Sequence, residues 1–318
     1  MQIGIDKEQR MILIVNMNVS LDKHYEMKAF VPNTVMRAGQ VDNTPGGKGI
    51  HVANVLQALS EKCLVTGMLG GKTGEFIEEK MQERMLEYDF QKIIGETRSC
   101  LAFTTEDNIQ TEILEPGPEV STKEYLQFIE KYTKLVQQAS LVVCSGSVPR
   151  NVPQNVYEVL IRLAERYGRR VLLDTSGALL EAGIRAKPFF IKPNRDELEA
   201  LCQRKLKSID DVLVEIKKLL AQGIFMVAVS LGADGAVFGC GSQLYRIRIP
   251  AIKAENPVGS GDAFVAGMAV GILQDMKPEN AAALAAACGT ANAMEKESGF
   301  VRCNVVESLL EKIKVEAL

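Results

Sequence analysis

The sequence predicts an α/β fold built on a mainly parallel β-sheet, with helices on both faces of the sheet. Short runs rich in apolar and β-branched residues, such as MILIVNM (11–17) and SLVVCSGS (140–147), alternate with helical patterns such as NVYEVLIRLAERYG (155–168). Strands of a parallel sheet are buried on both faces, so they read as near-continuous apolar runs, and crossover helices connect them. The alternation therefore predicts repeated βαβ units in three layers, α/β/α.

The same alternation continues along most of the chain. Further strands are expected at CLVTGML (63–69), RRVLLDTSG (169–177), FFIKPN (189–194) and MVAVSLG (226–232). Further helices are expected at GIHVANVLQAL (49–59), EFIEEKMQERML (75–86), DELEALC (196–202) and VLVEIKKLLAQG (212–223). With 318 residues, the chain is long enough for one large α/β core with insertions.

The composition is typical of a globular protein with a substantial core, since 47% of the residues are hydrophobic and 24% are charged. A net charge of −3, with dispersed Lys and Arg, offers no surface suited to a polyanion, so we expect no nucleic-acid partner. No run approaches the ~20 apolar residues that span a bilayer. The first ten residues, MQIGIDKEQR, are polar where a signal peptide would be apolar. We therefore expect a cytoplasmic protein with no membrane contact.

The seven cysteines are odd in number, widely spaced and mostly set in apolar runs, which favours free thiols in a reducing compartment. The chain has two histidines, His24 and His51, and no paired cysteine spacing. These residues provide little material for a zinc site or for a Ser-His-Asp triad, so we expect neither.

Two segments interrupt the alternation of strands and helices. Residues 30–44 and 98–115 contain alternating patterns, and in the second the polar dipeptide Asp107-Asn108 divides two strand-like runs as a hairpin turn would. We expect both segments to form an inserted β-strand lid. The remainder then forms the α/β core, in three pieces: residues 11–29, 45–97 and 116–318.

An inserted sheet with one apolar face needs a substrate cleft or a second subunit to cover that face. We therefore also expect a homodimer formed through the lid. The alternative is a surface hairpin with neither role.

The most informative segment is a Gly-rich turn that enters an apolar helix, NPVGSGDAFVAGMAVGIL (256–273). The backbone N–H groups of Gly259, Ser260 and Gly261 can point toward one anion, and the helix that follows adds its positive end. Asp262 lies at the start of that helix, where a carboxylate can cap the helix or take a proton beside a bound phosphate. The spacing alone leaves both roles open.

A second glycine cluster, PGGKGIHVANVL (45–56), also opens an amphipathic helix. Its paired glycines would let the backbone approach a ligand and Lys48 offers a cation, although such clusters also form plain turns and a turn lysine needs no function. A third cluster, TGMLGGKTGEF (66–76), contains the GGKT of a phosphate-binding loop, but Thr66 stands where the first glycine of that loop is required. We therefore do not expect a P-loop.

Taken together, the motifs resemble those of the PfkB carbohydrate kinases, in the branch that contains 1-phosphofructokinase and tagatose-6-phosphate kinase. The resemblance runs from about residue 12 to the C-terminal helices. It rests on NMNVSLD (16–22), PGGKGIHVA (45–53), GETRSCLAF (95–103), SGSVP (145–149), LDTSG (173–177), KPNRDEL (192–198), SLGADGA (230–236) and NPVGSGD (256–262), which follow in family order. Two positions depart from the family pattern: Val19 replaces the usual proline, and His51 stands where an asparagine that contacts the sugar is usual.

The resemblance implies a ribokinase-like three-layer α/β/α core and ATP-dependent phosphorylation of a ketohexose phosphate to a bisphosphate. It implies Asp262 as the catalytic base, with Gly259, Ser260 and Gly261 as the anion hole. The implied substrate-binding residues are Asp22, Gly46, Gly47, Lys48, His51, Arg98 and Ser147. The implied nucleotide-binding residues are Lys192, Asn194, Glu197, Ser230, Gly232, Gly235 and Asn292.

Cofactors and substrate contacts follow from the same resemblance. Asn194 and Glu197 are expected to hold Mg²⁺ through water, together with ATP, and a monovalent cation is a further candidate cofactor. Arg98 is the first candidate for holding the phosphate that the substrate already carries, because its planar guanidinium suits a phosphate better than the ammonium of Lys48. His51 is expected either to hydrogen-bond a sugar hydroxyl, as an amide does, or to lie on the helix surface without a ligand contact.

Several functions stay open. Fructose 1-phosphate, fructose 6-phosphate and tagatose 6-phosphate differ in phosphate position or in one stereocentre, and RSC (98–100) with TEILEPGP (111–118) favours tagatose-6-phosphate kinase. A 6-phosphofructokinase and a kinase for an unphosphorylated sugar or nucleoside are alternatives within the family. A non-catalytic regulator that responds to a sugar or nucleotide is the alternative outside enzymes, and retention of Asp262 argues against it.

Overall fold

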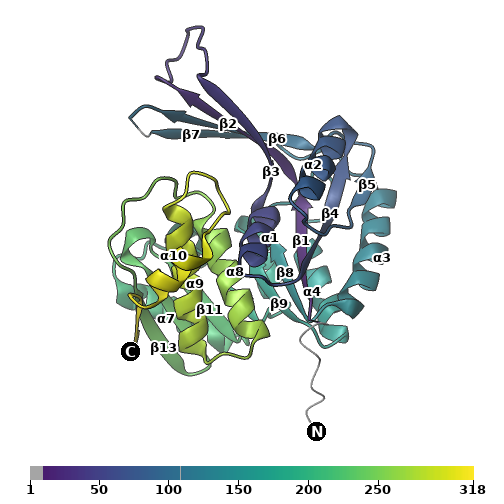
Figure 1. The fold of residues 1–318 in the computed structure, drawn as a ribbon. Helices are drawn as coiled ribbons and strands as arrows, with labels where there is room; N and C mark the ends of the chain where they lie inside the picture. Colours follow the sequence, from purple (N-terminus) through teal and green to yellow (C-terminus); the bar gives the residue numbers. More distant parts are fainter. Residues whose placement is uncertain (1–9, 108) are drawn as a thin grey trace.

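The computed structural model describes residues 10–107 and 109–318, and within them a ten-stranded sheet forms the centre of the molecule (Figure 1). Its strands lie in the order β14 (Lys314–Ala317), β13 (Gln243–Arg248), β12 (Ala236–Cys240), β11 (Met226–Ser230), β10 (Phe190–Ile191), β9 (Arg170–Asp174), β8 (Leu141–Ser145), β1 (Ile12–Asn18), β4 (Cys63–Gly70) and β5 (Gln91–Ile93). Neighbouring strands from β11 to β5 are parallel, and β12 to β14 are added antiparallel. The predicted mainly parallel sheet is confirmed.

Helices cover both faces of this sheet, which confirms the three predicted layers. In β1, Ile12 and Ile14 pack into one hydrophobic cluster, and Leu13 and Val15 pack into a second one, because successive side chains of a strand point to opposite faces. The helices on the Ile12 face are α1 (Lys48–Ala58), α2 (Gly71–Glu83), α8 (Ser260–Leu273), α9 (Pro278–Ala293) and α10 (Cys303–Leu310). Those on the Leu13 face are α3 (Thr122–Gln138), α4 (Val156–Arg166), α5 (Gly177–Ile184), α6 (Arg195–Cys202) and α7 (Ile209–Ala221).

A second, four-stranded sheet extends away from the core and contains parts of both segments expected to form a lid (Figure 1). Its strands lie in the order β3 (Gln40–Gly46), β2 (Ser20–Met27), β6 (Arg98–Thr105) and β7 (Gln110–Leu114). β6 and β7 pair antiparallel, as the alternating pattern predicted. Of the predicted turn dipeptide Asp107-Asn108, the second position lies outside the described residues.

Residues 11–29, expected in the core as one piece, divide between the two sheets. β1 ends at Asn18 in the core, and β2 begins at Ser20 in the lid. With Val19 alone between them and no turn residue, one continuous strand-like run enters both sheets, so the sequence shows no boundary. Within 30–44, only the part from Gln40 belongs to a strand, and residues 28–39 follow an irregular path.

The helices and the cysteines bear on two expectations from composition. Across residues 10–107 and 109–318, no helix combines the length and the apolar character that crossing a bilayer requires. All seven cysteines are free thiols, and Cys63, Cys144, Cys240 and Cys288 are buried. Burial raises the pKa of the Cys63 thiol to about 12, so that thiol stays protonated and unreactive.

Candidate active site

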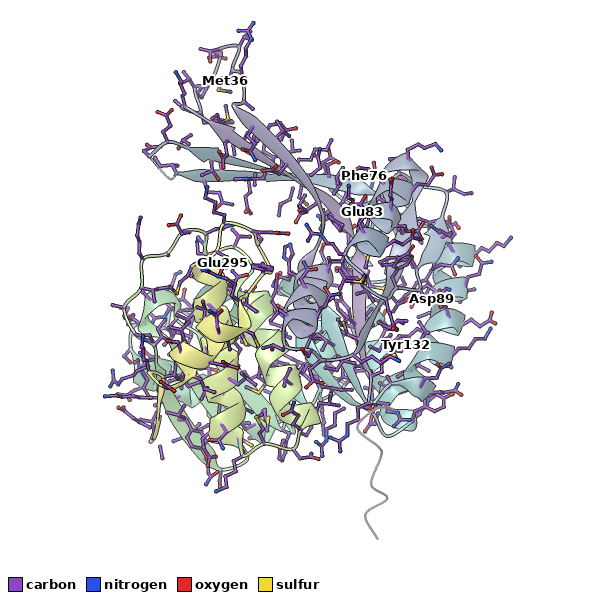
Figure 2. The ribbon with its side chains drawn as sticks, in the orientation of Figure 1. Met36, Phe76, Glu83, Asp89, Tyr132 and Glu295 are labelled. Atoms are coloured by element: carbon purple, nitrogen blue, oxygen red, sulfur yellow. The ribbon has the colours of Figure 1, made fainter. Side chains whose placement is uncertain are left out.

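A cleft of about 780 Å³ lies between the small sheet and the core. Figure 2 shows Met36 at the end of the small sheet away from the core, and Glu295 in the loop after α9, on the side of the core that faces that sheet. Twelve predicted site residues line the cleft: Asp22, Gly47, Lys48, His51, Arg98, Lys192, Asn194, Glu197, Ser230, Gly259, Gly261 and Asp262. Segments far apart in the sequence thus meet at one place.

The Gly-rich turn before α8 has the geometry of an anion-binding loop. Gly259 is the N-cap residue, with a φ of 83°, and a Cβ atom there would lie 2.5 Å from the backbone nitrogen of Gly299. No side chain caps this helix within the described residues. The N–H of Ser260 donates to the carbonyl of Pro257 at 3.2 Å, and the N–H groups of Gly259 and Gly261 stay available to a ligand. Asp262 follows in the first turn and is 5% exposed.

Asn292 fixes this turn from behind. Its Nδ2 donates to the carbonyl of Val258 at 2.8 Å, and its Oδ1 accepts from the backbone N–H of Gly299 at 2.8 Å. The side chain is fully buried and does not line the cleft. Its amide is engaged by backbone partners, so Asn292 supports the turn, and its contact with a nucleotide stays a prediction.

His51 lies between two carboxylates, on α1. Its Nδ1 is 2.9 Å from Oδ2 of Asp262, and its Nε2 is 3.2 Å from Oδ2 of Asp22. Burial alone would lower the pKa of His51, but the hydrogen bonds and charges of Asp22 and Asp262 raise that pKa to about 10. His51 is 8% exposed, so the expectation of a surface histidine is wrong.

Asp174 is a site residue that the sequence reasoning missed. It is buried at the end of β9, where its Oδ2 lies 3.1 Å from Nζ of Lys48 and its Oδ1 lies 3.5 Å from Nζ of Lys192. Burial would raise the pKa of Asp174, but the two ammonium groups lower it. Desolvation would lower the pKa of Lys48, but the charges of Asp174, Asp262 and Glu197 raise it. The ion pair with Asp174 holds the ammonium group in place, although the side chain of Lys48 is 39% exposed. The motif LDTSG contains this carboxylate and could have drawn attention to it.

The start of α6 presents two of the predicted nucleotide and metal residues. Asn194 Oδ1 accepts from the N–H of Glu197 at 2.8 Å, and Glu197 Oε2 accepts from the N–H of Asn194 at 2.8 Å, which is a capping box. A β-bridge brings Ser230 beside Asn194. Gly232 and Gly235, in the turn that follows, have positive φ angles of 60° and 80° but do not line the cleft.

Arg98 enters the cleft from the first residue of β6. Its Nη1 donates to the carbonyl of Glu115 at 3.0 Å, and its Nε and Nη2 donate to the carbonyl of Asn18 at 3.3 and 3.2 Å. A guanidinium has five N–H donors, so donors remain for a ligand. Among the described residues no carboxylate forms an ion pair with Arg98, whose partners are these two backbone carbonyls.

Three other predicted residues support the cleft without lining it. Gly46 lies under Asp22, where a Cβ atom would be 2.0 Å from the carboxylate carbon. Ser147 is exposed, and its Oγ accepts from Asn18 Nδ2 at 3.0 Å. Ser260 belongs to the anion loop, and its Oγ lies 3.3 Å from Asn292 Nδ2.

The sequence reasoning also missed several polar groups on the lid. His24 and Glu112 face the cleft from β2 and β7. Burial and the charge of Asp22 raise the pKa of Glu112. Alternation along these strands was the available signal, since every second residue of a strand faces the same side, but β2 was not recognised as a lid strand.

The third glycine cluster binds a carboxylate of the same chain. At the start of α2, the N–H groups of Lys72 and Thr73 donate to the carboxylate of Glu96, at 3.1 and 2.6 Å. This helix start therefore has an internal partner, whereas that of α8 faces the cleft.

The arrangement brings together a carboxylate, an anion-binding helix start, two anchored lysines and a guanidinium. Such a set can orient a polyol, bind phosphate groups and take a proton from a hydroxyl.

Known proteins match this chain over nearly its whole length. The family model described as pfkB family carbohydrate kinase matches residues 15–301. The tagatose-6-phosphate kinase of Staphylococcus epidermidis is 38% identical over 311 residues, which are 96% of this chain and 99% of that protein. Phosphofructokinase-2 of Escherichia coli, solved in complex with potassium, has a TM-score of 0.91 at 25% identity, over 95% of this chain and 99% of that one. A possible 1-phosphofructokinase of Thermotoga maritima has a TM-score of 0.89 at 27% identity, over 97% of this chain and 100% of that one.

Proposed function

The chain belongs to the pfkB family of carbohydrate kinases, and from that premise we propose that it transfers the γ-phosphoryl group of ATP to a hydroxyl of a ketohexose phosphate. The observation that carries the proposal is the position of Asp262. Its carboxylate lies at the start of α8 beside the anion loop and lines the same cleft as Asp22 and Arg98. A kinase for a phosphorylated sugar needs a base, an anion hole and a phosphate-binding cation within one cleft.

In the proposed reaction, Asp262 accepts the proton of the attacking hydroxyl. The hydroxyl oxygen forms a bond to the γ-phosphorus, and the bond from that phosphorus to the β-phosphate oxygen breaks, which releases ADP. His51 occupies Oδ2 of Asp262, so Oδ1 is the oxygen that takes the proton. The N–H groups of Gly259 and Gly261 stabilise the negative charge on the transferring group, aided by the positive end of α8.

The anchored lysines complete the charge balance on the phosphate side. Lys48 and Lys192 are both tied to Asp174 and both line the cleft. A Cβ atom at Gly261 would lie 3.1 Å from Nζ of Lys192, so this ammonium is adjacent to the anion loop. We assign Lys192 to the phosphate chain of ATP, and Lys48 to the space between that chain and the sugar.

The start of α6 has a donor set that fits Mg²⁺. The capping box uses Oε2 of Glu197, and Oε1 remains as a ligand for water molecules around the ion. Magnesium keeps several waters and uses one or two carboxylates together with phosphate oxygens, so Glu197 and Asn194 would hold it through water. When bound, the ion neutralises charge on the phosphates. A monovalent cation is a further candidate, tested by comparing turnover in potassium and sodium salts at equal ionic strength.

Arg98 is the proposed site for the phosphate that the substrate already carries. Two backbone carbonyls hold the guanidinium at the junction of lid and core, and no carboxylate neutralises it within the described chain. A guanidinium with free donors binds a phosphate with two parallel charge-assisted hydrogen bonds. Asp22, on the neighbouring strand β2, is positioned to orient sugar hydroxyls in the same cleft.

Tagatose 6-phosphate is the first candidate substrate, supported by the identity to the staphylococcal tagatose-6-phosphate kinase. The test is a coupled assay of ADP release from ATP and Mg²⁺, with tagatose 6-phosphate, fructose 6-phosphate, fructose 1-phosphate and the unphosphorylated sugars. We expect turnover to be highest with one of the phosphorylated ketohexoses. A preference for an unphosphorylated sugar would contradict the proposed substrate class, and nucleotide binding without turnover on any sugar would favour a regulator.

We also propose that the lid forms a homodimer. Asp22, His24 and Glu26 of β2 line the cleft, so Tyr25 lies on the opposite face of the small sheet. On that face Tyr25 pairs with Val41 and stacks on Phe103 at 5.1 Å between ring centroids. Val41 and Ile113 are 45% and 48% exposed. Exposed aromatic and aliphatic side chains on one sheet face are typical of a surface that a second copy covers.

A further inference from the structure

Both ring nitrogens of His51 contact protein carboxylates. Nδ1 is hydrogen-bonded to Asp262 at 2.9 Å, and Nε2 lies 3.2 Å from Asp22. The imidazole therefore has no ring nitrogen left for a sugar hydroxyl. A residue that was expected to contact the substrate thus lies between Asp22 and Asp262.

The contacts also determine the charge of the ring. An ionised carboxylate only accepts hydrogen bonds, and a neutral imidazole carries one N–H, so it can donate to one of the two carboxylates and not to both. The imidazolium cation donates to both. The geometry of this site thus fits the cation, in agreement with the raised pKa of His51 described above.

We propose that His51 is a positioning residue that, as an imidazolium, bridges Asp22 and Asp262 and keeps the carboxylate of Asp262 turned toward the reacting hydroxyl. The inference rests on the proposed role of Asp262. It goes further by assigning a function to the histidine that departs from the family's asparagine, a function exerted through Asp262 and not through contact with the sugar.

Packing holds the ring in this position. A Cβ atom at Gly299 would lie 2.4 Å from Cβ of His51, so the loop after α9 closes tightly over α1 at this point. Gly299 also donates to Asn292, the residue that supports the anion loop. His51 and the start of α8 therefore pack against the same loop, which places Nδ1 beside Asp262.

Most of the charged groups around the His51 ring are carboxylates. Asp22 on β2 and Asp262 on α8 contact the ring directly, and Glu112 on β7 is close enough to interact with its charge. Lys48, on the same helix as His51, acts on Asp262 but is tied to Asp174. Removal of the imidazolium would leave Asp22 and Asp262 as like charges facing each other, and like charges favour binding of a proton by one of them.

The first test measures the charge of the ring directly. The protein has two histidines, so the variant His24→Gln contains one imidazole, that of His51. Side-chain ¹⁵N NMR of this variant without ligands should show both ring nitrogens protonated throughout the range from about pH 6 to about pH 9, where an ordinary histidine with a pKa of about 6.5 loses its proton. A ring that loses its proton below about pH 8 would overturn the inference.

The second test measures the consequence for the reaction. In His51→Asn and His51→Gln the cation is gone, so the acid limb of the pH profile of kcat/KM should move to higher pH by about one unit or more. At neutral pH kcat should fall about tenfold or more, because the carboxylate of Asp262 is no longer held in the orientation that the reaction needs. The matched control is His24→Asn, which removes an imidazole that is bonded to Thr104 in the same cleft. This control should leave the position of the acid limb unchanged.

The outcomes separate the inference from the proposed function. If the ring is charged but the acid limb stays in place in both His51 variants, the imidazolium does not act on the base and the inference fails. If Asp262→Asn is inactive while the His51 ring is neutral, the proposed function stands and the inference about His51 is wrong. If the ring is charged and Asp262→Asn keeps its turnover, the role of Asp262 fails, and with it the positioning role of His51.

Discussion

Oδ2 of Asp174 lies 3.1 Å from Nζ of Lys48, at a point where β9 and α1 meet under the cleft. The same carboxylate faces Lys192 at 3.5 Å from its other oxygen. Asp174 and Lys192, which follows β10, are buried, while the side chain of Lys48 is 39% exposed. The single anion holds both cations in place.

Replacing Asp174 by alanine should destabilise the protein, because two ammonium groups then face each other without a counter-charge. Breaking a buried ion pair on one side typically costs about 3 kcal/mol of unfolding free energy. Urea denaturation of Asp174→Ala without nucleotide measures this loss. The control is Glu130→Ala, which removes an exposed pair with Lys134 and should cost less than about 1 kcal/mol. Equal small losses in the two variants would contradict the anchoring role of Asp174.

Stability should fall with rising pH in a way that depends on His51. Its pKa is about 10 in the folded protein and about 6.5 in an unfolded chain. The folded state therefore holds this proton more tightly, and its contribution to stability is complete below about pH 6.5 and is lost as the pH rises through about 10. Between these limits the stability advantage of wild type over His51→Asn should shrink by about 1.4 kcal/mol per pH unit. A constant difference from pH 7 to pH 9 in urea denaturation would contradict the raised pKa.

Arg98→Ala should weaken the reaction with the phosphorylated sugar selectively. Loss of a charge-assisted bidentate contact to a phosphate costs about 2–5 kcal/mol, so kcat/KM for the sugar phosphate should fall about 30-fold or more. The KM for ATP should change far less. Arg98→Lys keeps the charge and loses the planar fork, so it should recover only part of the activity. Equal losses of kcat/KM with phosphorylated and unphosphorylated sugars would show that Arg98 does not bind the phosphate of the substrate.

Ile113→Asp should separate the proposed dimer. Ile113 is 48% exposed on the outer face of the small sheet, and a charge placed there would have to be buried in the interface. Light scattering should give the mass of a dimer for wild type and a monomer for the variant. Ile94→Asp is the matched control, since Ile94 is 95% exposed and lies outside the lid. A wild-type protein that is monomeric and fully active at micromolar concentration would contradict the proposed dimer.

The core of the fold could be predicted because its strands and helices carry strong local patterns. The run ILIVNMN is buried along its whole length in β1, as a strand covered on both faces must be. β2 could not be predicted in the same way, because its residues SLDKHYEM are half-buried and follow β1 without a turn. Which sheet they join is decided by tertiary pairing with Arg98–Thr105, and that pairing has no local signal.

The site was only partly predictable for a similar reason. Glycine turns at helix starts are visible in the sequence, and Gly259 and Asp262 were identified from them. The contact between His51 and Asp262 joins residues 211 positions apart, and the charge of the ring depends on that contact. Asn292 was assigned to the nucleotide, but burial turned its amide toward the backbone, and no pattern in the sequence distinguishes these two roles.

The most direct test of the account is the turnover of Asp262→Asn with ATP, Mg²⁺ and the best sugar phosphate. The amide fits the space of the carboxylate but cannot accept the proton of the hydroxyl, so kcat should fall about 10²–10⁴-fold. The dissociation constant of ATP, measured by calorimetry, should stay within a few-fold of wild type. Near-normal turnover under conditions where the chemical step limits the rate would contradict the assignment of Asp262 as the base.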